Sequence, residues 1–278
     1  MTIYKNFVDY KECVVPLIQR FTNVEYLTLS LAIDLKRPLT NSFIDGYDLE
    51  NDITSHMSHL RRFHFHIRSV LENAPHIPTD TIRQSFRKEK YEFVDCSLDY
   101  FNNNYSQCQI YSLPFVGTRL DFVSNRFPLF DTNKTFSMVT IVLLFDDIQP
   151  FESVFFERLA QALPYLKTLE IFNQLEQQEK ISTSINNLIF PHLVTLILFD
   201  IHINYAEQLV IRTSLPCLKE LAIDNDILLT IIDQDQHQTR DNCSRVERLR
   251  TSKPLDNSIN IIQNYFPLDS FEEHPCAK

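Results

Sequence analysis

A short apolar pattern, Φ-x-x-Φ-x-x-Φ-x-Φ with Φ for an apolar residue, recurs along this sequence and restricts the folds open to it. Its clearest copies lie in the second half of the chain: FSMVTIVLLF (136–145), LPYLKTLEIF (163–172), FPHLVTLILF (190–199) and LPCLKELAID (215–224). Their second apolar residues are spaced by 27, 27 and 25 positions, at Val139, Leu166, Leu193 and Leu218. This period falls within the roughly 20 to 29 residues of a leucine-rich repeat. A weaker copy, CSRVERLR, follows at 243–250.

The N-terminal half contains two more copies at a longer spacing. They are FTNVEYLTLSL (21–31) and MSHLRRFHFHI (57–67), with Val24 and Leu60 at the second apolar position. The stretch between MSHLRRFHFHI and FSMVTIVLLF lacks the pattern, although it contains the strand-like sequences YEFVDCSL and QCQIYSLPF. We therefore expect the 70–135 segment to consist either of degenerate repeats or of an inserted hairpin layer.

Segments with helical periodicity separate the copies. The clearest are FESVFFERLAQAL (151–163), with apolar residues every three or four positions, and NYAEQLVI (204–211). One short strand and one helix per repeat predict an α/β fold: an irregular leucine-rich-repeat-like solenoid with a parallel concave sheet and outer helices. We expect a single solenoid over 1–268 and a tail over 269–278.

Alternation along each strand predicts which side chains leave the core. Leu196 and Leu198 are expected to point inward, so Ile197 and Phe199 point outward. Corresponding positions in the other copies complete a candidate protein-binding surface on the concave face: Leu143, Phe145, Glu170, Phe172, Ile197, Phe199 and Asp224. Two interpretations stay open, because large bare apolar patches are rare on monomers. Either a protein partner binds there, or the 70–135 segment folds over the phenylalanines and buries them.

Polar residues at the strand ends suggest structural roles first. Asp146, Asn173, Asp200 and Asn225 follow the strands, where such side chains accept hydrogen bonds from turn amides. A row of carboxylates for metal binding or catalysis is the less favoured alternative. The four histidines between His56 and His66 could ligate zinc, but their spacing favours a solvated basic patch with Arg61, Arg62 and Arg68. The sequence therefore predicts no metal site.

Composition argues against several functional classes. The net charge of −10 disfavours binding to the phosphate backbone of nucleic acids. Only two glycines are present, where average usage would give about 19, and neither lies in a phosphate-binding or nucleophile motif. No local catalytic signature is found either. We therefore expect a protein without enzymatic activity, cofactor or nucleic-acid partner.

The sequence also bears on where the chain resides. Its longest apolar run, MVTIVLLF, is far shorter than the roughly 20 residues that span a bilayer, so no membrane association is predicted. The N-terminus has charges where a secretory signal needs an apolar core. Six cysteines without a C-x-x-C pair are typical of reduced thiols. A cytoplasmic or nuclear location is expected.

The ordered set of motifs resembles a known family. The segment FIDGYDLENDITSHMSHLRRFHFHI (43–67), then QCQIYSLPF, VTIVLLFDDIQPFESVFFERLAQALPYLKTLEIFN and FPHLVTLILFDIH, is similar to the leucine-rich-repeat portion of an expanded invertebrate family of F-box domain proteins. The resemblance covers the chain from about Asn23 to Phe266. It implies that the repeats hold a substrate protein, while an N-terminal F-box docks on the Skp1 subunit of a ubiquitin ligase.

This sequence departs from the family at its N-terminus. No F-box is recognisable before FTNVEYLTL, and the chain contains no tryptophan. We expect a Skp1-type partner only if a longer form carries an F-box. The function predicted from the sequence is a non-enzymatic protein-interaction module, the substrate-recognition part of an F-box-type ubiquitin ligase adaptor. The alternative is a stand-alone leucine-rich-repeat scaffold with no link to a ligase.

Overall fold

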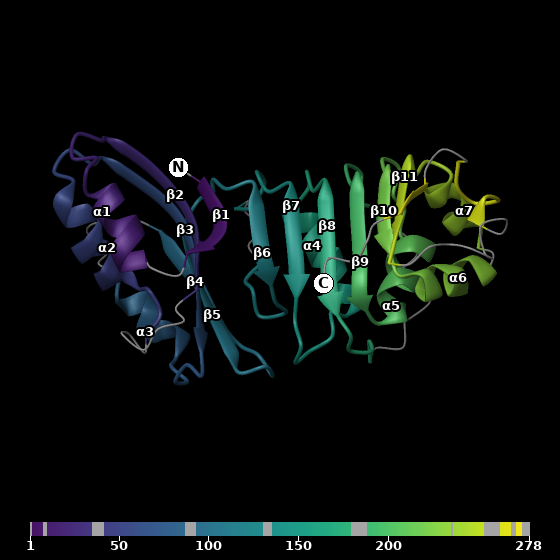
Figure 1. Ribbon diagram of the computed structural model, residues 1–278, viewed down its shortest axis with the longest axis horizontal. Coiled ribbons are helices and arrows are strands. Elements are labelled where there is room, and N and C mark those ends of the chain that lie inside the picture. Colours follow the sequence, from purple (N-terminus) through teal and green to yellow (C-terminus); the bar gives the residue numbers. More distant parts are fainter. Residues whose placement is uncertain are drawn as a thin grey trace. The chain divides into compact units, whose positions relative to one another are not determined.

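The computed structural model divides into two compact units (Figure 1). The first comprises Met1–Gly117 and Arg126–Pro128, and the second Thr118–Asn125 and Leu129–Lys278. The division falls inside the 70–135 segment, where the repeated pattern is missing. The structure describes residues 2–7, 10–34, 42–86, 93–129, 135–178, 188–234, 236–252, 262–267 and 271–273, with only the backbone described for 2–7 and 271–273.

The first unit contains a five-stranded mixed sheet with the order β1-β2-β3-β5-β4. The first three strands of this order are parallel, and the last two form an antiparallel hairpin added to β3. The hairpin alternative for the 70–135 segment therefore describes β4 and β5, which extend the sheet. The strands are β1 (Thr2–Phe7), β2 (Tyr26–Asp34), β3 (Arg62–Glu72), β4 (Val94–Tyr100) and β5 (Tyr105–Ser112).

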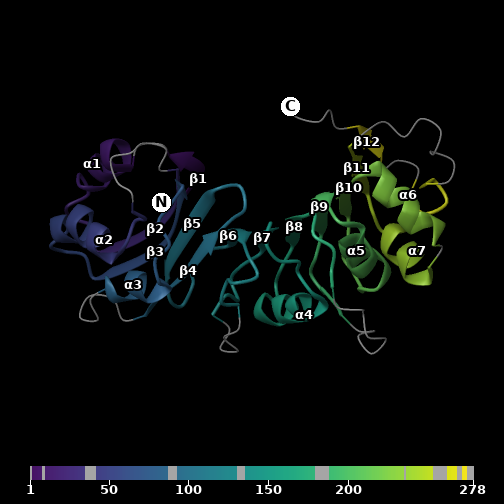
Figure 2. The same cartoon turned by 90° about the horizontal axis from the view of Figure 1, so that it is seen from below.

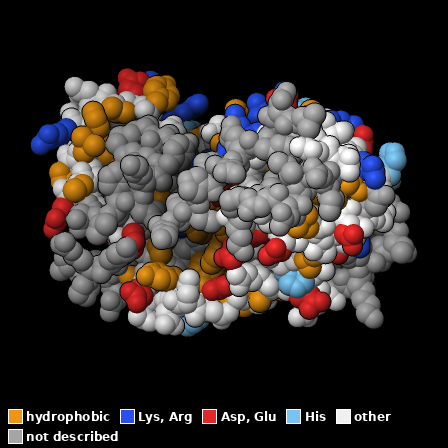
Figure 3. All heavy atoms as spheres, turned by 45° about the vertical axis from the view of Figure 1, so that its right-hand side comes forward, with side chains coloured by type: hydrophobic (Ala, Val, Ile, Leu, Met, Phe, Trp, Pro, Cys, Tyr) orange, Lys and Arg blue, Asp and Glu red, His pale blue; other side chains and the backbone are white. Residues whose placement is uncertain are grey.

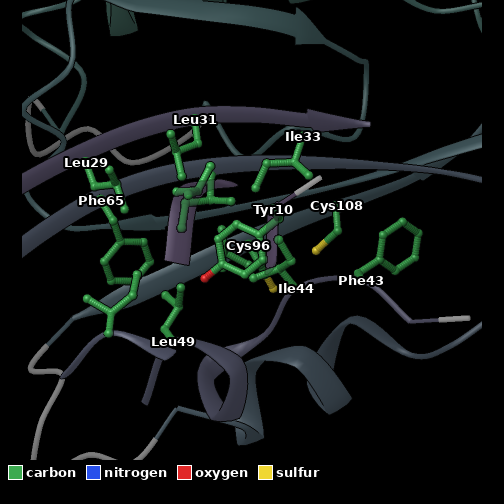
Figure 4. Packing of buried hydrophobic residues seen from close by; sticks show 14 of the residues in the cluster. Tyr10, Leu29, Leu31, Ile33, Phe43, Ile44, Leu49, Phe65, Cys96 and Cys108 are labelled. Carbon is green, nitrogen blue, oxygen red and sulfur yellow. The ribbon is translucent and has the colours of Figure 1, made fainter. Parts of the chain in front are cut away.

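Short helices supply the rest of the first unit's core. Leu29 and Ile33 of β2 pack in one buried cluster with Leu49 from a helix and Phe65 of β3 (Figure 4). Burial of such apolar side chains is the main stabilising contribution to a unit of this size. The helices are η1 (Tyr10–Val14), α1 (Val15–Ile18), α2 (Gly46–Asp52), η2 (Thr54–His56) and α3 (Thr79–Gln84).

Helix α2 begins with a reciprocal cap and lies very close to the end of α3. Asp45 accepts hydrogen bonds from the backbone N–H groups of Tyr47 and Asp48, at 2.9 and 3.1 Å. The N–H of Gly46 donates to the Ser85 hydroxyl at 2.7 Å. A Cβ atom at position 46 would lie 2.6 Å from the Ser85 carbonyl carbon and oxygen, so glycine is needed here for close approach.

The second unit contains a seven-stranded parallel sheet in which spatial order follows chain order. Each repeated pattern of this unit ends in one strand, and its second apolar residue is buried in all five copies that lie in the unit. This confirms the predicted α/β class. Residues 269–278, expected as a tail, include β12. The strands are β6 (Arg119–Val123), β7 (Ile141–Phe145), β8 (Thr168–Asn173), β9 (Thr195–Ile201), β10 (Glu220–Ile223), β11 (Arg248–Thr251) and β12 (Phe271–Glu273).

Helices lie on one side of this sheet (Figure 2). Leu169 and Ile171 of β8, and Leu196 and Leu198 of β9, are fully buried on the helical side. The described helices are α4 (Ser153–Ala162), α5 (Ile203–Ala206), η3 (Glu207–Ile211), α6 (Asn225–Asp233) and α7 (His237–Cys243). The two segments with predicted helical periodicity correspond to α4 and to α5 with η3. None of the helices in the described part of the chain has the length and apolar composition needed to cross a bilayer.

Candidate functional site

The face of the second sheet opposite its helices, here called the outer face, carries the alternate residues of each strand. Along β8 the exposure alternates: Leu169 and Ile171 are buried, whereas Glu170 and Phe172 are partly exposed. The next strand repeats this pattern, with Ile197 partly exposed between two buried leucines. Period-two alternation of this kind is what a strand with two different faces produces.

Strand register brings several of the candidate residues side by side. Leu143 pairs with Glu170, Glu170 with Ile197, and Ile197 with Ala222, so these four cross β7 to β10 in one row. Neighbouring strands lie about 4.8 Å apart, which places each side chain against the next. The ends of this row are its most buried members, because Leu143 is 9% exposed and Ala222 is 1% exposed.

The three phenylalanines of the candidate surface do not form one regular row across the strands. Phe145 and Phe172 are direct register partners, but the pairing of β8 with β9 shifts before Phe199 has a partner. Asp200, the next residue, has a positive φ of 56°. An extra residue in one strand of a pair makes a bulge and redirects its neighbours. Phe199 is partly exposed but lies at this bulge, outside the regular register.

Another aromatic residue extends the row at its other end. The ring of Phe122 in β6 packs against Phe145, with centroids 5.8 Å apart and planes at 65°. This edge-to-face arrangement is favourable for aromatic pairs. Phe122 lies in the 70–135 segment, which lacks the repeated pattern. Strand β6 is irregular between Leu120 and Val123, with a positive φ at Phe122.

Glu170 is a carboxylate set among apolar side chains. Among the described residues no hydrogen bond or ion pair reaches its oxygens. The nearby Arg119 already donates two hydrogen bonds from Nε to Asp121, at 2.7 and 2.9 Å. Burial raises the pKa of the Glu170 carboxyl; the positive charge of Arg119 lowers this pKa and the negative charge of Asp121 raises it. Glu170 is therefore a partly desolvated acid without its own cation.

The opposite side of the outer face has a different charge arrangement. Glu220 of β10 forms ion pairs with both Arg250 and Arg248 of β11, the latter at 3.8 Å. The hydroxyl of Thr195 also donates to Glu220, at 3.4 Å. The acidic and basic groups here are paired with one another within the chain, although Nε of Arg250 is buried without a hydrogen-bond partner among the described residues. Together with the Arg119 and Asp121 pair, they border the apolar residues on two sides.

Asp224, the last candidate residue, has a structural contact. Its carboxylate accepts a hydrogen bond from the backbone N–H of Asp200 at 3.3 Å, and it precedes α6. Asp200 itself accepts a hydrogen bond from Gln174. Asp224 thus joins the end of β10 to the bulge in β9, and whether it also contacts a partner stays a prediction.

Two of the four expected turn residues act as predicted. Asp146 is buried and accepts hydrogen bonds from the N–H groups of Ile148 and Gln149, at 2.9 and 3.1 Å. Asn173 accepts one from Leu175 at 2.8 Å. Asn225 instead is the first residue of α6. These geometries describe tied turns rather than a row of carboxylates that converge on one point.

The histidine segment forms no cluster. His64 Nδ1 lies 3.4 Å from the Ser112 hydroxyl, and His66 Nε2 lies 3.0 Å from the Gln109 amide oxygen. Arg68 is buried, so the expected solvated patch is wrong for this arginine, because β3 is the central strand of its sheet. In the part of the chain that the structure describes, no three His, Cys, Asp or Glu side chains are grouped to hold a metal ion.

No protein-family model matches this chain, and neither a curated protein nor a solved structure resembles it significantly. The outer face is therefore identified by its own geometry. The sequence alone pointed to Leu143, Phe145, Glu170, Phe172 and Ile197, which the structure places side by side. Phe122 was not predicted from the sequence. The one signal for it is that an apolar residue ends the segment RLDF, which follows a turn that contains a glycine.

Proposed function

We propose that this chain is a protein-interaction module that binds a partner protein through the outer face. The observation that carries the proposal is the contiguous set Leu143, Phe145, Phe172 and Ile197, which is apolar, lies away from the helices and is bordered by charged pairs. Apolar and aromatic side chains enclosed by a polar rim are typical of protein interfaces. The partner contacts the apolar centre, and the charged border orients it.

The arrangement supports a leucine-rich-repeat-like solenoid for the second unit. One strand per repeat, chain-order pairing and helices on one side are the features of such an architecture. The curvature of such solenoids creates the extended concave surface that they use for binding. The outer face of β7 to β10 corresponds to that surface.

We further propose that the module recognises substrates for an F-box-type ubiquitin ligase. This rests on the sequence resemblance given above. Residues 10–34 belong to the first unit, where they form η1, α1 and β2. A Skp1-binding element would therefore come from a longer form of the protein. Purified Skp1-type subunit, tested by pulldown against this chain and any longer form, separates an adaptor from a stand-alone scaffold.

Substitution on the outer face tests the interaction itself. The variant Phe172→Ser should abolish capture of the partner while the chain stays folded, because the side chain contributes little to the core beneath the sheet. Val154→Ser is a matched control, since Val154 is an exposed apolar residue on α4, on the helical side. Equal partner binding by both variants would contradict the proposal. If Phe172→Ser unfolds the chain instead, the phenylalanine serves as core.

A further inference from the structure

We infer that the partner segment presents a lysine or arginine side chain between apolar residues, and that its cation binds the carboxylate of Glu170. This inference rests on the proposed function, because it assumes that the outer face binds a protein. It specifies the chemistry of the occupant.

Glu170 makes no hydrogen bond or ion pair among the described residues, although a carboxylate can accept several. Arg119 is bound to Asp121, and both Arg248 and Arg250 are bound to Glu220. The described arginines of the outer face are thus already paired with other acids. Glu170 is left for a cation from outside.

Glu170 lies between apolar neighbours in the sheet. Its register partners are Leu143 on β7 and Ile197 on β9, so apolar side chains flank it on both sides. The same strand carries Phe172 two residues later. A partner that covers these apolar groups must also cover the carboxylate, and burying an ionised carboxylate without compensation is strongly unfavourable. A cation placed against it removes that penalty.

An unpaired carboxylate among apolar side chains makes the surface selective for the charge of its partner. A partner with an acidic or purely apolar side chain at this point would leave Glu170 buried and unpaired, and so would bind more weakly. The net charge of −10 favours the approach of basic segments over acidic ones. Acidic side chains are visible beside apolar ones on the face shown in Figure 3. The combined surface selects for a basic residue with apolar neighbours.

The experiment uses the full chain and a random peptide library displayed on phage. Selection is carried out in parallel on the wild type, on Glu170→Gln, on Glu170→Lys and on Phe172→Ser. Glu176→Gln is the matched control, because Glu176 is an exposed acid of the same unit outside the outer face. Peptides enriched on the wild type should carry lysine or arginine flanked by apolar residues. Glu170→Lys should enrich aspartate or glutamate at that position.

A selected peptide then gives a quantitative test. Replacing its basic residue by glutamine should weaken binding to the wild type by about tenfold, and Glu170→Gln should weaken the basic peptide by about the same factor. In a double-mutant cycle the two losses should not add, because both remove one interaction. Glu176→Gln should bind like the wild type. If the two losses are additive in the cycle, Glu170 and the basic residue of the peptide do not form an ion pair.

The outcomes separate this inference from the proposed function. Peptides that lose binding on Phe172→Ser but show no basic preference would support the outer face as a binding site and refute the role of Glu170. Peptides that bind Phe172→Ser and the wild type equally would refute both. Failure to enrich any peptide on the wild type would also count against both, because an accessible apolar face with an unpaired acid should select ligands from such a library.

Discussion

The hydroxyl of Tyr205 accepts a hydrogen bond from the backbone N–H of Phe151 at 3.1 Å, and this contact joins α5 to the segment that precedes α4. Both residues are fully buried. Their rings also pack edge to face, with centroids 6.4 Å apart. The contact links the β7 repeat to the β9 repeat beneath the sheet, across 54 positions of the sequence, or two repeat lengths.

Replacing Tyr205 by phenylalanine keeps the ring and removes this acceptor. The N–H of Phe151 is then buried without a partner, so we expect a loss of about 1 to 3 kcal/mol in the free energy of unfolding. Urea denaturation followed by circular dichroism measures it. Tyr165→Phe is the control, because Tyr165 is exposed, and it should change stability by less than about 0.5 kcal/mol. Equal effects of the two would contradict the role of the hydroxyl.

Replacing Gly46 by alanine should destabilise the first unit by about 2 to 3 kcal/mol, since the added methyl group would collide with the backbone of Ser85. Thermal unfolding of single variants and of the double variant Gly46→Ala with Ser85→Ala checks the cause. Removing the Ser85 hydroxyl should give no rescue, because the collision is with the carbonyl group that every residue has. Rescue by the double variant would show that the side chain was the obstacle.

Replacing Asn242 even by aspartate, which has nearly the same shape, is expected to lower the stability of the protein. Its amide nitrogen donates to the carbonyl oxygens of Val210 and Thr213 at 2.9 and 2.8 Å, and its oxygen accepts from the Leu215 N–H at 3.1 Å. Aspartate cannot donate when ionised, so Asn242→Asp should lose about 2 to 4 kcal/mol. Chemical denaturation at neutral pH tests this, with exposed Asn264→Asp as the control. A stable Asn242→Asp variant would refute the bonding pattern.

Glu170 should make stability depend on pH in a direction opposite to that of most paired acids. Its folded pKa is raised, mainly by burial, with Arg119 and Asp121 as the charges that act on it. Below the unfolded pKa the carboxyl is protonated in both states and adds no penalty. As pH rises from that value through the raised folded value, the folded state must ionise a desolvated acid, so stability falls.

Glu170→Gln removes this penalty and should be more stable than the wild type at neutral pH. The difference should disappear below about pH 4, where the wild-type carboxyl is protonated even in the unfolded chain. Denaturation curves at several pH values measure it, and Glu176→Gln should follow the wild type throughout. A variant that is less stable than the wild type at neutral pH would mean that Glu170 is paired.

The strands of the second sheet could be predicted because the pattern repeats. Val139, Leu166, Leu193 and Leu218 each begin a strand-forming segment, and their spacing places the strands next to one another. The first unit was harder, because β4 and β5 lack the pattern. They are antiparallel, and only a short connection with Asn104 at a positive φ of 64° separates them. Such a connection is too short for a parallel pair.

Only part of the candidate site could be predicted from the sequence. Alternation along β8 predicts that Glu170 and Phe172 leave the core, because it depends on residues close in sequence. The bulge at Asp200 depends on the positive φ of this residue, and no neighbouring glycine indicates such a conformation in the sequence. The pairing of Arg119 with Asp121 lies at the edge of the sheet, in a segment without the pattern. That no cation among the described residues is paired with Glu170 therefore became evident only from the assembled sheet.

The identity of spatial and chain order in the second sheet has a consequence for how such a surface can change in size. Each strand pairs only with the strands of the preceding and following repeats, so one whole repeat can be added or removed while the strand pairing of distant repeats stays intact. Every added repeat would widen the outer face by about 4.8 Å. The number of repeats therefore sets the breadth of the partner that this face can cover.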